Sequence, residues 1–168
     1  NNSFGWSLLM ARRLVSLGVN LVQVNLGNMG TWDLHGNAFP LARDFLFPPT
    51  DLAISALFDD LSESGLLEET MVVIAGEFGR TPTINKNTGR DHWGALQSAV
   101  LAGGGIQGGQ VYGKSDKQSA YPTEKPVAPE DLPATMYHAL GIPPDTMIYD
   151  HLNRPHRICD GRPLTALF

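Results

Sequence analysis

The stretch that decides the fold reads Met71-Val72-Val73-Ile74-Ala75-Gly76-Glu77-Phe78-Gly79. Its first five residues are apolar and rich in β-branched side chains, as in a strand that is covered on both faces. The run leads directly into Glu77 beside two glycines, where packing gives no reason for an acid. Because a buried ionised carboxylate needs a cation or a metal ion next to it, the stretch predicts a central strand with a functional acid at its end. The alternative is an acid that bonds to neighbouring backbone N–H groups or to Arg80.

Two further strands are predicted, one before and one after this stretch. Residues 19–26 alternate between apolar and polar side chains, and they end in the glycine-rich residues 27–31. Residues 98–102 form another short apolar run. A strand that follows a helix and ends in a glycine-rich loop is typical of α/β proteins, in which sites form at the carboxyl ends of parallel strands. We therefore expect an α/β fold.

Three helices are predicted from apolar spacing and from residues that start or stop a helix. The first covers residues 3–17 and is followed by Gly18. The second begins with Thr50 or Asp51 as its cap and ends at Gly65. The third covers residues 130–140. Polar and proline-rich residues between the last strand and this helix predict an exposed loop over 115–129.

The composition of the chain excludes several classes of protein. Its 168 residues fit one domain, 1–168, with a real core. The formal net charge of −5 argues against a general nucleic-acid binder. A single cysteine, Cys159, excludes an intrachain disulfide and a cysteine metal cage, and it leaves the compartment open. No apolar run approaches the length of a membrane span. The start at Asn1 lacks an initiator methionine and a signal peptide, which suggests a piece of a longer protein.

Two loops hold acids and histidines in a pattern that suits a metal ion. The first reads Trp32-Asp33-Leu34-His35-Gly36-Asn37, and the second reads Gly89-Arg90-Asp91-His92-Trp93. With Glu77 they offer carboxylate oxygens and imidazole nitrogens, which bind divalent ions such as zinc or manganese. Turn and cap roles in ordinary loops are the alternative. Because two parallel strands end at the same edge of a sheet, we expect four side chains to converge on one point: Asp33, His35, Glu77 and His92.

The chain resembles the carboxyl-terminal part of the bacterial domain-of-unknown-function family 1501, in the alkaline phosphatase and sulfatase superfamily. The motifs that carry the resemblance are Trp32-Asp33-x-His35-Gly36-Asn37, Gly76-Glu77-Phe78-Gly79-Arg80-Thr81-Pro82, Gly89-Arg90-Asp91-His92-Trp93 and Leu101-Ala102-Gly103-Gly104-Gly105-Ile106. The resemblance implies a three-layer α/β/α sandwich with a mostly parallel sheet. It also implies that residues 1–168 are the late part of a larger alkaline-phosphatase-like domain, so the sheet is incomplete here.

The same resemblance implies a metal-dependent hydrolase of phosphate or sulfate esters. In that superfamily one metal site takes an acid and a histidine from a loop such as Asp33 to His35. A later strand ends in Asp-His-Gly, and here Glu77 keeps the carboxylate while Phe78 replaces the histidine. His92 would stand for a further histidine of the superfamily, and Asp91 is an additional candidate ligand. The implied cofactor is a divalent metal ion: zinc, manganese or calcium.

Arg80 and Arg90 are the candidate catalytic residues, because a guanidinium group holds an anionic ester by paired hydrogen bonds. The superfamily nucleophile is outside this chain, and Cys159 lacks the Cys-x-Pro-x-Arg pattern of sulfatases. The expected partner is a small anionic ester, together with self-association or a missing amino-terminal part. No nucleic acid or membrane span is expected, and the resemblance suggests export to the periplasm. The alternative is a non-catalytic binding or structural domain that keeps the fold around a decayed metal site.

Overall fold

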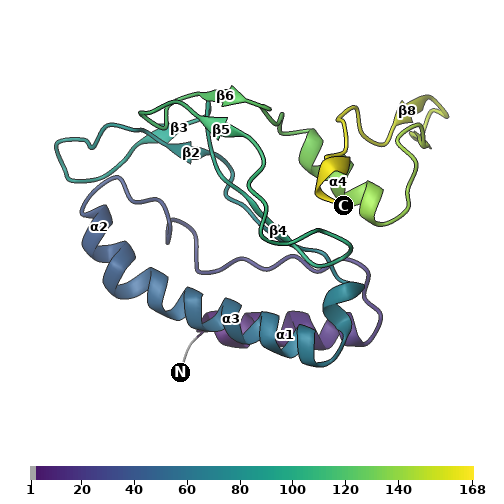
Figure 1. Cartoon of the computed structure of the whole chain (residues 1–168), viewed down its shortest axis with the longest axis horizontal. Helices are drawn as coiled ribbons and strands as arrows, with labels where there is room; N and C mark the ends of the chain where they lie inside the picture. Colours follow the sequence, from purple (N-terminus) through teal and green to yellow (C-terminus); the bar gives the residue numbers. More distant parts are fainter. Residues whose placement is uncertain (1–2) are drawn as a thin grey trace. The chain divides into compact units, whose positions relative to one another are not determined.

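The computed structural model describes residues 3–168 and divides into two compact units (Figure 1). Unit 1 contains the chain up to Thr70 together with Gly76–Ser98, and unit 2 contains Met71–Ala75 together with Ala99–Phe168. The chain leaves unit 1 for the five residues that hold the predicted central strand, and it returns at Gly76. Glu77 and the strand before it therefore belong to different units.

Helix α1 (Ser3–Ser16) confirms the first predicted helix. Gly18 follows it with φ +87°, the left-handed conformation that closes a helix at little cost for glycine. The helix lies beside α3 (Phe47–Glu63), as Figure 1 shows. Arg12 of α1 joins the two helices, because its Nη2 donates to Asp60 Oδ1 at 3.0 Å. One side of unit 1 is thus a pair of packed helices.

The second predicted helix begins earlier than its sequence signals indicate. Helix α2 (Ala38–Leu41), a π-helical turn (Ala42–Leu46) and α3 follow one another without a break. The cap predicted at Thr50 or Asp51 is wrong, because the Thr50 hydroxyl donates to Leu46 O at 2.7 Å inside a continuous helix. The helix ends as predicted, with Gly65 at φ +73°, and a 3₁₀ turn follows at Leu66–Glu68.

The core of unit 1 forms between the helices and an extended segment. Phe4, Leu8 and Ala53 are its buried centre, and Val24 and Leu26 pack against it from the segment 19–26. That segment has no strand pairing, so the strand predicted there is wrong. Exposed and half-buried side chains alternate from Leu21 to Leu26, and Val24 and Leu26 face the helices instead of a neighbouring strand.

Strand pairing in the described residues is short and antiparallel throughout. Unit 1 pairs β2 (Gly79–Arg80) with β3 (His92–Trp93). Unit 2 has three further pairs: β1 (Val72–Ile74) with β4 (Val100–Ala102), β5 (Lys114–Ser115) with β6 (Pro122–Glu124), and β7 (Met147–Tyr149) with β8 (Pro155–Arg157).

These pairs contradict the predicted three-layer α/β/α sandwich with a mostly parallel sheet. Strands β1 and β4 confirm the two apolar runs as strands, but each run pairs only with the other. All three residues of β1 are half-buried, as expected of a strand in a two-stranded pair. A parallel sheet needs strands that return in the same direction through a crossover, and the described residues contain none.

Unit 2 is organised around helix α4 (Asp131–Ala139), which confirms the third predicted helix. Thr135 is fully buried in α4, where its hydroxyl donates to Asp131 O at 2.6 Å. The same hydroxyl accepts the Leu164 N–H at 3.0 Å, which fastens the carboxyl-terminal residues to the helix. The segment ends in a 3₁₀ turn at Thr165–Leu167.

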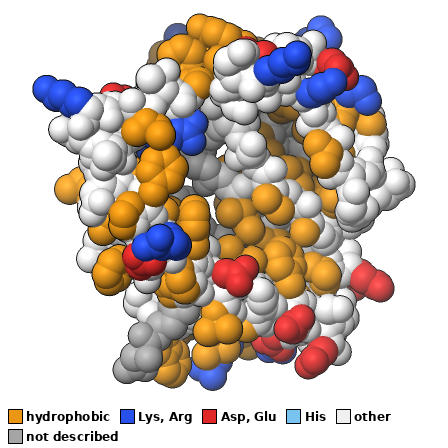
Figure 2. All heavy atoms as spheres, turned by 60° about the vertical axis from the view of Figure 1, so that its left-hand side comes forward, with side chains coloured by type: hydrophobic (Ala, Val, Ile, Leu, Met, Phe, Trp, Pro, Cys, Tyr) orange, Lys and Arg blue, Asp and Glu red, His pale blue; other side chains and the backbone are white. Residues whose placement is uncertain are grey.

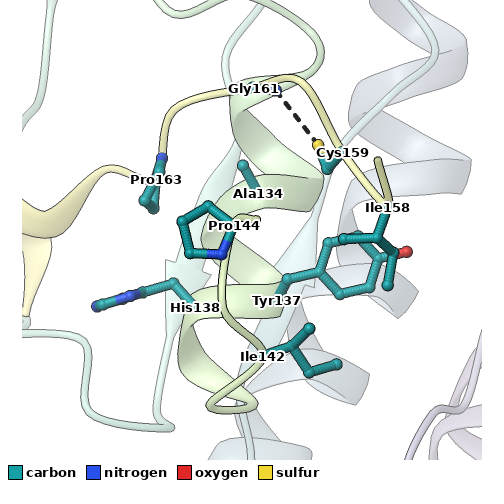
Figure 3. A pocket seen from close by; sticks show the side chains of 9 residues that line it. All are labelled: Ala134, Tyr137, His138, Ile142, Pro144, Ile158, Cys159, Gly161 and Pro163. Atoms are coloured by element: carbon teal, nitrogen blue, oxygen red, sulfur yellow. Dashed lines mark hydrogen bonds between the residues drawn. The ribbon is translucent and has the colours of Figure 1, made fainter. Parts of the chain in front are cut away.

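A small pocket lies beside α4, with side chains from the helix and from the tail around it (Figure 3). Cys159 stands at its edge, where its Sγ accepts the Gly161 N–H at 3.4 Å. The thiol in turn lies 3.3 Å from Glu130 O and donates to it. Both contacts join backbone to side chain, so Cys159 serves to hold the turn after β8 against the start of α4.

The surface carries many large hydrophobic side chains, which Figure 2 shows in orange among scattered charged groups. Leu17 and Met29 of unit 1 and Val111 of unit 2 are among the most exposed. The self-association expected from the sequence stays a prediction. Among residues 3–168, no helix combines the length with the apolar character that crossing a bilayer requires.

Asp150 is expected to make the β7–β8 hairpin sensitive to acid. Its Oδ1 accepts the N–H groups of Leu152 and Arg154, both at 2.9 Å. The hydrogen bond from the Arg154 backbone is the main cause that lowers the pKa of Asp150 below its ordinary value of 3.8. A lowered pKa means that the stabilisation is complete above 3.8 and is lost as the pH falls through the folded-state value.

This expectation is checked by following the Leu152 and Arg154 amide signals by NMR from about pH 6 to about pH 2. Both should shift together with a midpoint below 3.8, the ordinary carboxyl value. The Asp150→Asn protein is the control and should lose this transition. A midpoint at or above 3.8 would contradict the assignment.

Candidate metal centre

Two loops of unit 1 lie against each other and build the candidate site. The loop that follows Trp32 pairs with the loop that leads into β3, first through the Arg90 N–H, which donates to Leu34 O at 3.1 Å. The Asn37 N–H donates to Asn87 O at 2.9 Å, which closes the far end. Strand β3 is itself held by β2, in which Arg80 is the partner of His92. Both loops are therefore fixed by backbone hydrogen bonds.

Gly89 permits this close approach. A Cβ at this position would overlap the backbone of His35 and Gly36. Backbone atoms cannot move aside as the end of a long side chain can, so the position requires glycine. The sequence motif Gly-Arg-Asp-His-Trp thus begins with a residue that lets the two loops touch.

The loops bring together a ligand triad, which consists of Asp33, His35 and His92. His92 Nε2 lies 2.9 Å from Asp33 Oδ1, and His35 Nε2 lies 3.0 Å from the same oxygen. The two imidazole Nε2 atoms are 3.1 Å apart. One oxygen and two nitrogens thus meet at one point, although His92 is 59 positions from Asp33 in the chain.

Asp91 contacts the triad from outside, through His35. Its Oδ1 lies 2.6 Å from His35 Nδ1, the ring nitrogen that faces away from the triad. Asn85 Nδ2 donates to the same oxygen at 3.0 Å and to His35 O at 2.9 Å. Sequence reasoning missed Asn85, which ties the two loops together. Its position in the Asn-Lys-Asn-Thr-Gly turn was the available signal, because asparagine side chains often bond to nearby backbone groups in turns.

The two candidate arginines occupy different places. Arg80 reaches the triad, and its Nη1 lies 2.7 Å from Asp33 Oδ1. Arg90 instead donates from Nε to Thr81 O at 2.6 Å and from Nη2 to Arg80 O at 3.2 Å. The structure therefore places one guanidinium group beside the ligand oxygen and engages the other with backbone carbonyls.

Hydrogen bonds keep Asp33 of the triad and the neighbouring Asp91 ionised. His92 and then Arg80 are the main causes that lower the pKa of Asp33 to about 2. The hydrogen bond with His35, followed by that from Asn85, holds the pKa of Asp91 below its ordinary value. Both carboxylates are thus available as acceptors at neutral pH, as metal ligation or ligand orientation requires.

The structure does not bring Glu77 into the triad. Glu77 is exposed, and the group of possible metal ligands in the described residues has three members, without it. Phe78, the residue after it, contacts the triad instead, because its ring centre lies 4.4 Å from that of His92. The Phe78 ring thus packs on a histidine of the triad.

Comparison with known proteins gives a family and no function. A family model described as a protein of unknown function (DUF1501) matches residues 1–168. Neither the curated proteins nor the solved structures contain a match to this chain.

Proposed function

Since the chain belongs to the DUF1501 family of proteins of unknown function, we propose its function from the site: unit 1 binds a divalent metal ion and hydrolyses phosphate or sulfate esters. The observation that carries the proposal is the meeting of Asp33 Oδ1, His35 Nε2 and His92 Nε2 within hydrogen-bonding distance of one another. Two imidazoles and one carboxylate are a donor set that suits first-row divalent metals.

The triad fits an ion that exchanges with solvent. The side chains of Asp33, His35 and His92 are 42%, 44% and 49% exposed, so an ion and a substrate reach them without any opening of the fold. Asp91 holds His35 from behind, in the way that outer carboxylates orient metal-ligating histidines. The residues present therefore fit a metal ion with open positions toward solvent.

Charge around the triad favours an anionic substrate once an ion is bound. Asp33 and Asp91 carry two negative charges, and Arg80 returns one positive charge. A divalent ion changes this one surplus negative charge into one positive charge, which attracts a phosphate or sulfate ester. A bound ion of this type supplies Lewis acidity and lowers the pKa of a bound water. Arg80, beside Asp33 Oδ1, orients an ester oxygen through its guanidinium group.

The sequence motifs support, as part of the same proposal, a relation to a larger superfamily of hydrolases. The order of the Asp-x-His loop, the Gly-Glu-Phe-Gly segment and His92 resembles the late ligands of the alkaline phosphatase and sulfatase superfamily. We propose on this basis that the chain corresponds to the carboxyl-terminal part of such a protein. The ester class is drawn from this kinship and from the charge of the site.

One observation favours a non-catalytic role for the same residues. Arg80 already neutralises Asp33 at 2.7 Å, and its Nη2 donates to Trp32 O at 3.3 Å. With these contacts the cluster joins two loops of unit 1 without any ion. In that case the triad is a structural cross-link between the two loops.

Calorimetric titration with zinc, manganese and calcium separates the two roles. The wild-type protein is expected to bind at least one ion, and His92→Ala should weaken binding by at least about 100-fold, because a ligand matters more than an outer-shell partner. His151→Ala is the matched control, since this exposed histidine lies in unit 2, and it should bind as the wild type does. Hydrolysis of p-nitrophenyl phosphate and sulfate is then measured with the bound ion. Absence of binding to every ion would reject the hydrolase and favour the structural cross-link.

A further inference from the structure

Large apolar side chains face solvent along the outer side of helix α1. Trp6 and Met10 of α1, and Leu17 directly after it, are between 55% and 81% exposed. Their steps of four and seven residues place them in one stripe along the helix. Phe4 and Leu8 lie on the opposite side and are buried in the core of unit 1. Because a surface helix keeps polar residues on its solvent side, the stripe indicates a surface that another chain covers.

Helix α3 lies beside α1 and extends this surface (Figure 1). Both helices bury one side in the same core, where Ala53 of α3 packs with Phe4 and Leu8 of α1. Their exposed sides therefore face away from that core together. We call this outer side the helix face, and we define it by six exposed residues: Trp6, Met10, Arg13, Leu52, Asp59 and Glu63.

The two helices carry opposite charges. Helix α1 has two arginines and no acid, whereas helix α3 has four acids and no base. One ion pair forms between them inside the chain, with Arg12 Nε 2.8 Å from Asp60 Oδ2. In the described part of the chain Arg13 has no ion-pair partner, and neither has Asp59 or Glu63. The helix face thus holds a cation on one helix and two acids on the other that no group of the same chain neutralises.

The positions of Asp59 and Glu63 are unfavourable within a single chain. The two acids are four residues apart on α3, a spacing at which like charges repel each other. They also stand near the carboxyl end of the helix, where the helix dipole is negative. A cation from a second molecule would relieve both effects, and Arg13 of another copy of this chain is such a cation.

The direction of the helices decides how two copies fit together. Arg12 near the end of α1 meets Asp60 near the end of α3, and Phe4 packs with Ala53 further back, so the helices run in the same direction. Residues 48 positions apart are therefore at about the same level along the pair. A second copy related by a two-fold axis along the helices places α1 against the α3 of that copy at these levels.

In this arrangement charged residues meet charged residues and apolar residues meet apolar ones. Arg13 falls between the two free acids of the second copy. Trp6 falls next to Leu52 of the second copy, and the exposed Ala56 one turn further leaves room for the indole ring. Each contact occurs twice, because a two-fold axis makes the interface complementary to itself.

We infer that the helix face is the interface of a two-fold dimer, in which α1 of each copy packs on α3 of the other. The inference is independent of the proposed metal binding, because the helix face and the triad share no residue. Helix α1 has 14 residues and is about 21 Å long, and two adjacent helices are about 20 Å wide. A face of this size forms a small interface, so the dissociation constant is expected in the micromolar range.

Sedimentation velocity over roughly 1 to 500 μM of the 168-residue chain tests the dimer. The wild type is expected to pass from monomer to dimer across this range. Met10→Glu should stay monomeric, because a dimer would bury the new charge without a partner. Met29→Glu is the matched control, since Met29 is fully exposed in a loop of unit 1 and lies on neither helix. The control should dimerise as the wild type does.

Charge reversal tests the pairing of Arg13 with the two acids. Arg13→Glu changes two symmetric attractions into repulsions, so the dissociation constant of the dimer should rise by about 10-fold or more. Adding Asp59→Arg and Glu63→Arg to the same chain should restore most of the lost affinity. Circular dichroism confirms that each variant is folded, and all three substitutions are at exposed positions. Failure of the combined variant to regain affinity would overturn the pairing.

The other occupants of the helix face are told apart in the same experiments. A wild type that stays monomeric at every concentration would overturn the dimer. If that monomer binds vesicles of phosphatidylcholine and phosphatidylglycerol, the helix face belongs to a lipid surface instead. Dimerisation of Met10→Glu at wild-type strength would also overturn the inference. A dimer that binds no metal ion would support this inference and reject the hydrolase, and a monomer that binds an ion would do the reverse.

Discussion

Replacing Gly89 with alanine is expected to reduce metal affinity by about 100-fold or more, beyond the usual loss of an outer-shell partner. The added Cβ would overlap the backbone of His35 and Gly36, so the two loops must move apart. The hydrogen bond from the Arg90 N–H to Leu34 O would break with this movement. Because the triad takes its members from both loops, a shift of about an ångström separates its donor atoms from a common ion.

Gly94→Ala is the matched control for this prediction. Gly94 lies in the same segment, and a Cβ there meets no atom within 4 Å. The control should bind cobalt(II) as the wild type does, and it should melt at the same temperature. Binding of wild-type strength by Gly89→Ala would show that the loops tolerate separation and that the close approach is unimportant for the site.

Helices were the most predictable part of the fold, because local signals set their positions. Gly18, Gly65 and Gly141 each adopt positive φ where the sequence predicts a helix to end. The start of α3 was missed, because a π-helical turn joins it to α2, and Pro48 and Pro49 are tolerated in its first turn. Local sequence signals predict where a helix ends, but they do not show whether it is continuous with the helix before it.

Sheet architecture was not predictable from the apolar runs. Residues 71–75 do contain a strand, β1. An apolar run predicts that a strand forms, but it does not specify the strand with which it pairs. Pairing depends on contacts between distant residues, and here β1 meets only β4, in the antiparallel direction. The segment 19–26 shows the same limit, since Val24 and Leu26 pack on helices and not on a neighbouring strand.

Most of the site was visible in the motifs. Asp-x-His and Asp-His supplied all three members of the triad, because few residue types bind metals and they stood together in two loops. Glu77 was expected beside them because a parallel sheet would bring the ends of two strands to one edge. The structure has no such sheet among the described residues, and Glu77 is not a member of the triad. Asn85 and the different roles of Arg80 and Arg90 depend on loop geometry that spacing alone does not carry.

Replacing Phe4 with alanine is expected to lower the free energy of unfolding by about 3–5 kcal/mol. Phe4 is 8% exposed, and it packs in the core of unit 1 with Leu8 and Ala53. Its ring also stacks on Trp32, with centres 6.3 Å apart, and Trp32 stands directly before Asp33. The loss therefore reaches from the core to the loop that carries two members of the triad.

Phe45→Ala is the matched control, because Phe45 lies in the π-helical turn of the same unit and is 68% exposed. This substitution is expected to change the free energy of unfolding by no more than about 0.5 kcal/mol. Urea unfolding measures both variants, and equal losses would show that Phe4 is not a core residue. Cobalt(II) at 100 times its dissociation constant should then raise the free energy of unfolding by about 2.7 kcal/mol in each protein that keeps the site. Phe45→Ala should gain this amount in full, and Phe4→Ala should gain less at the same ion concentration, because a loosened Trp32 lets Asp33 leave the other two ligands.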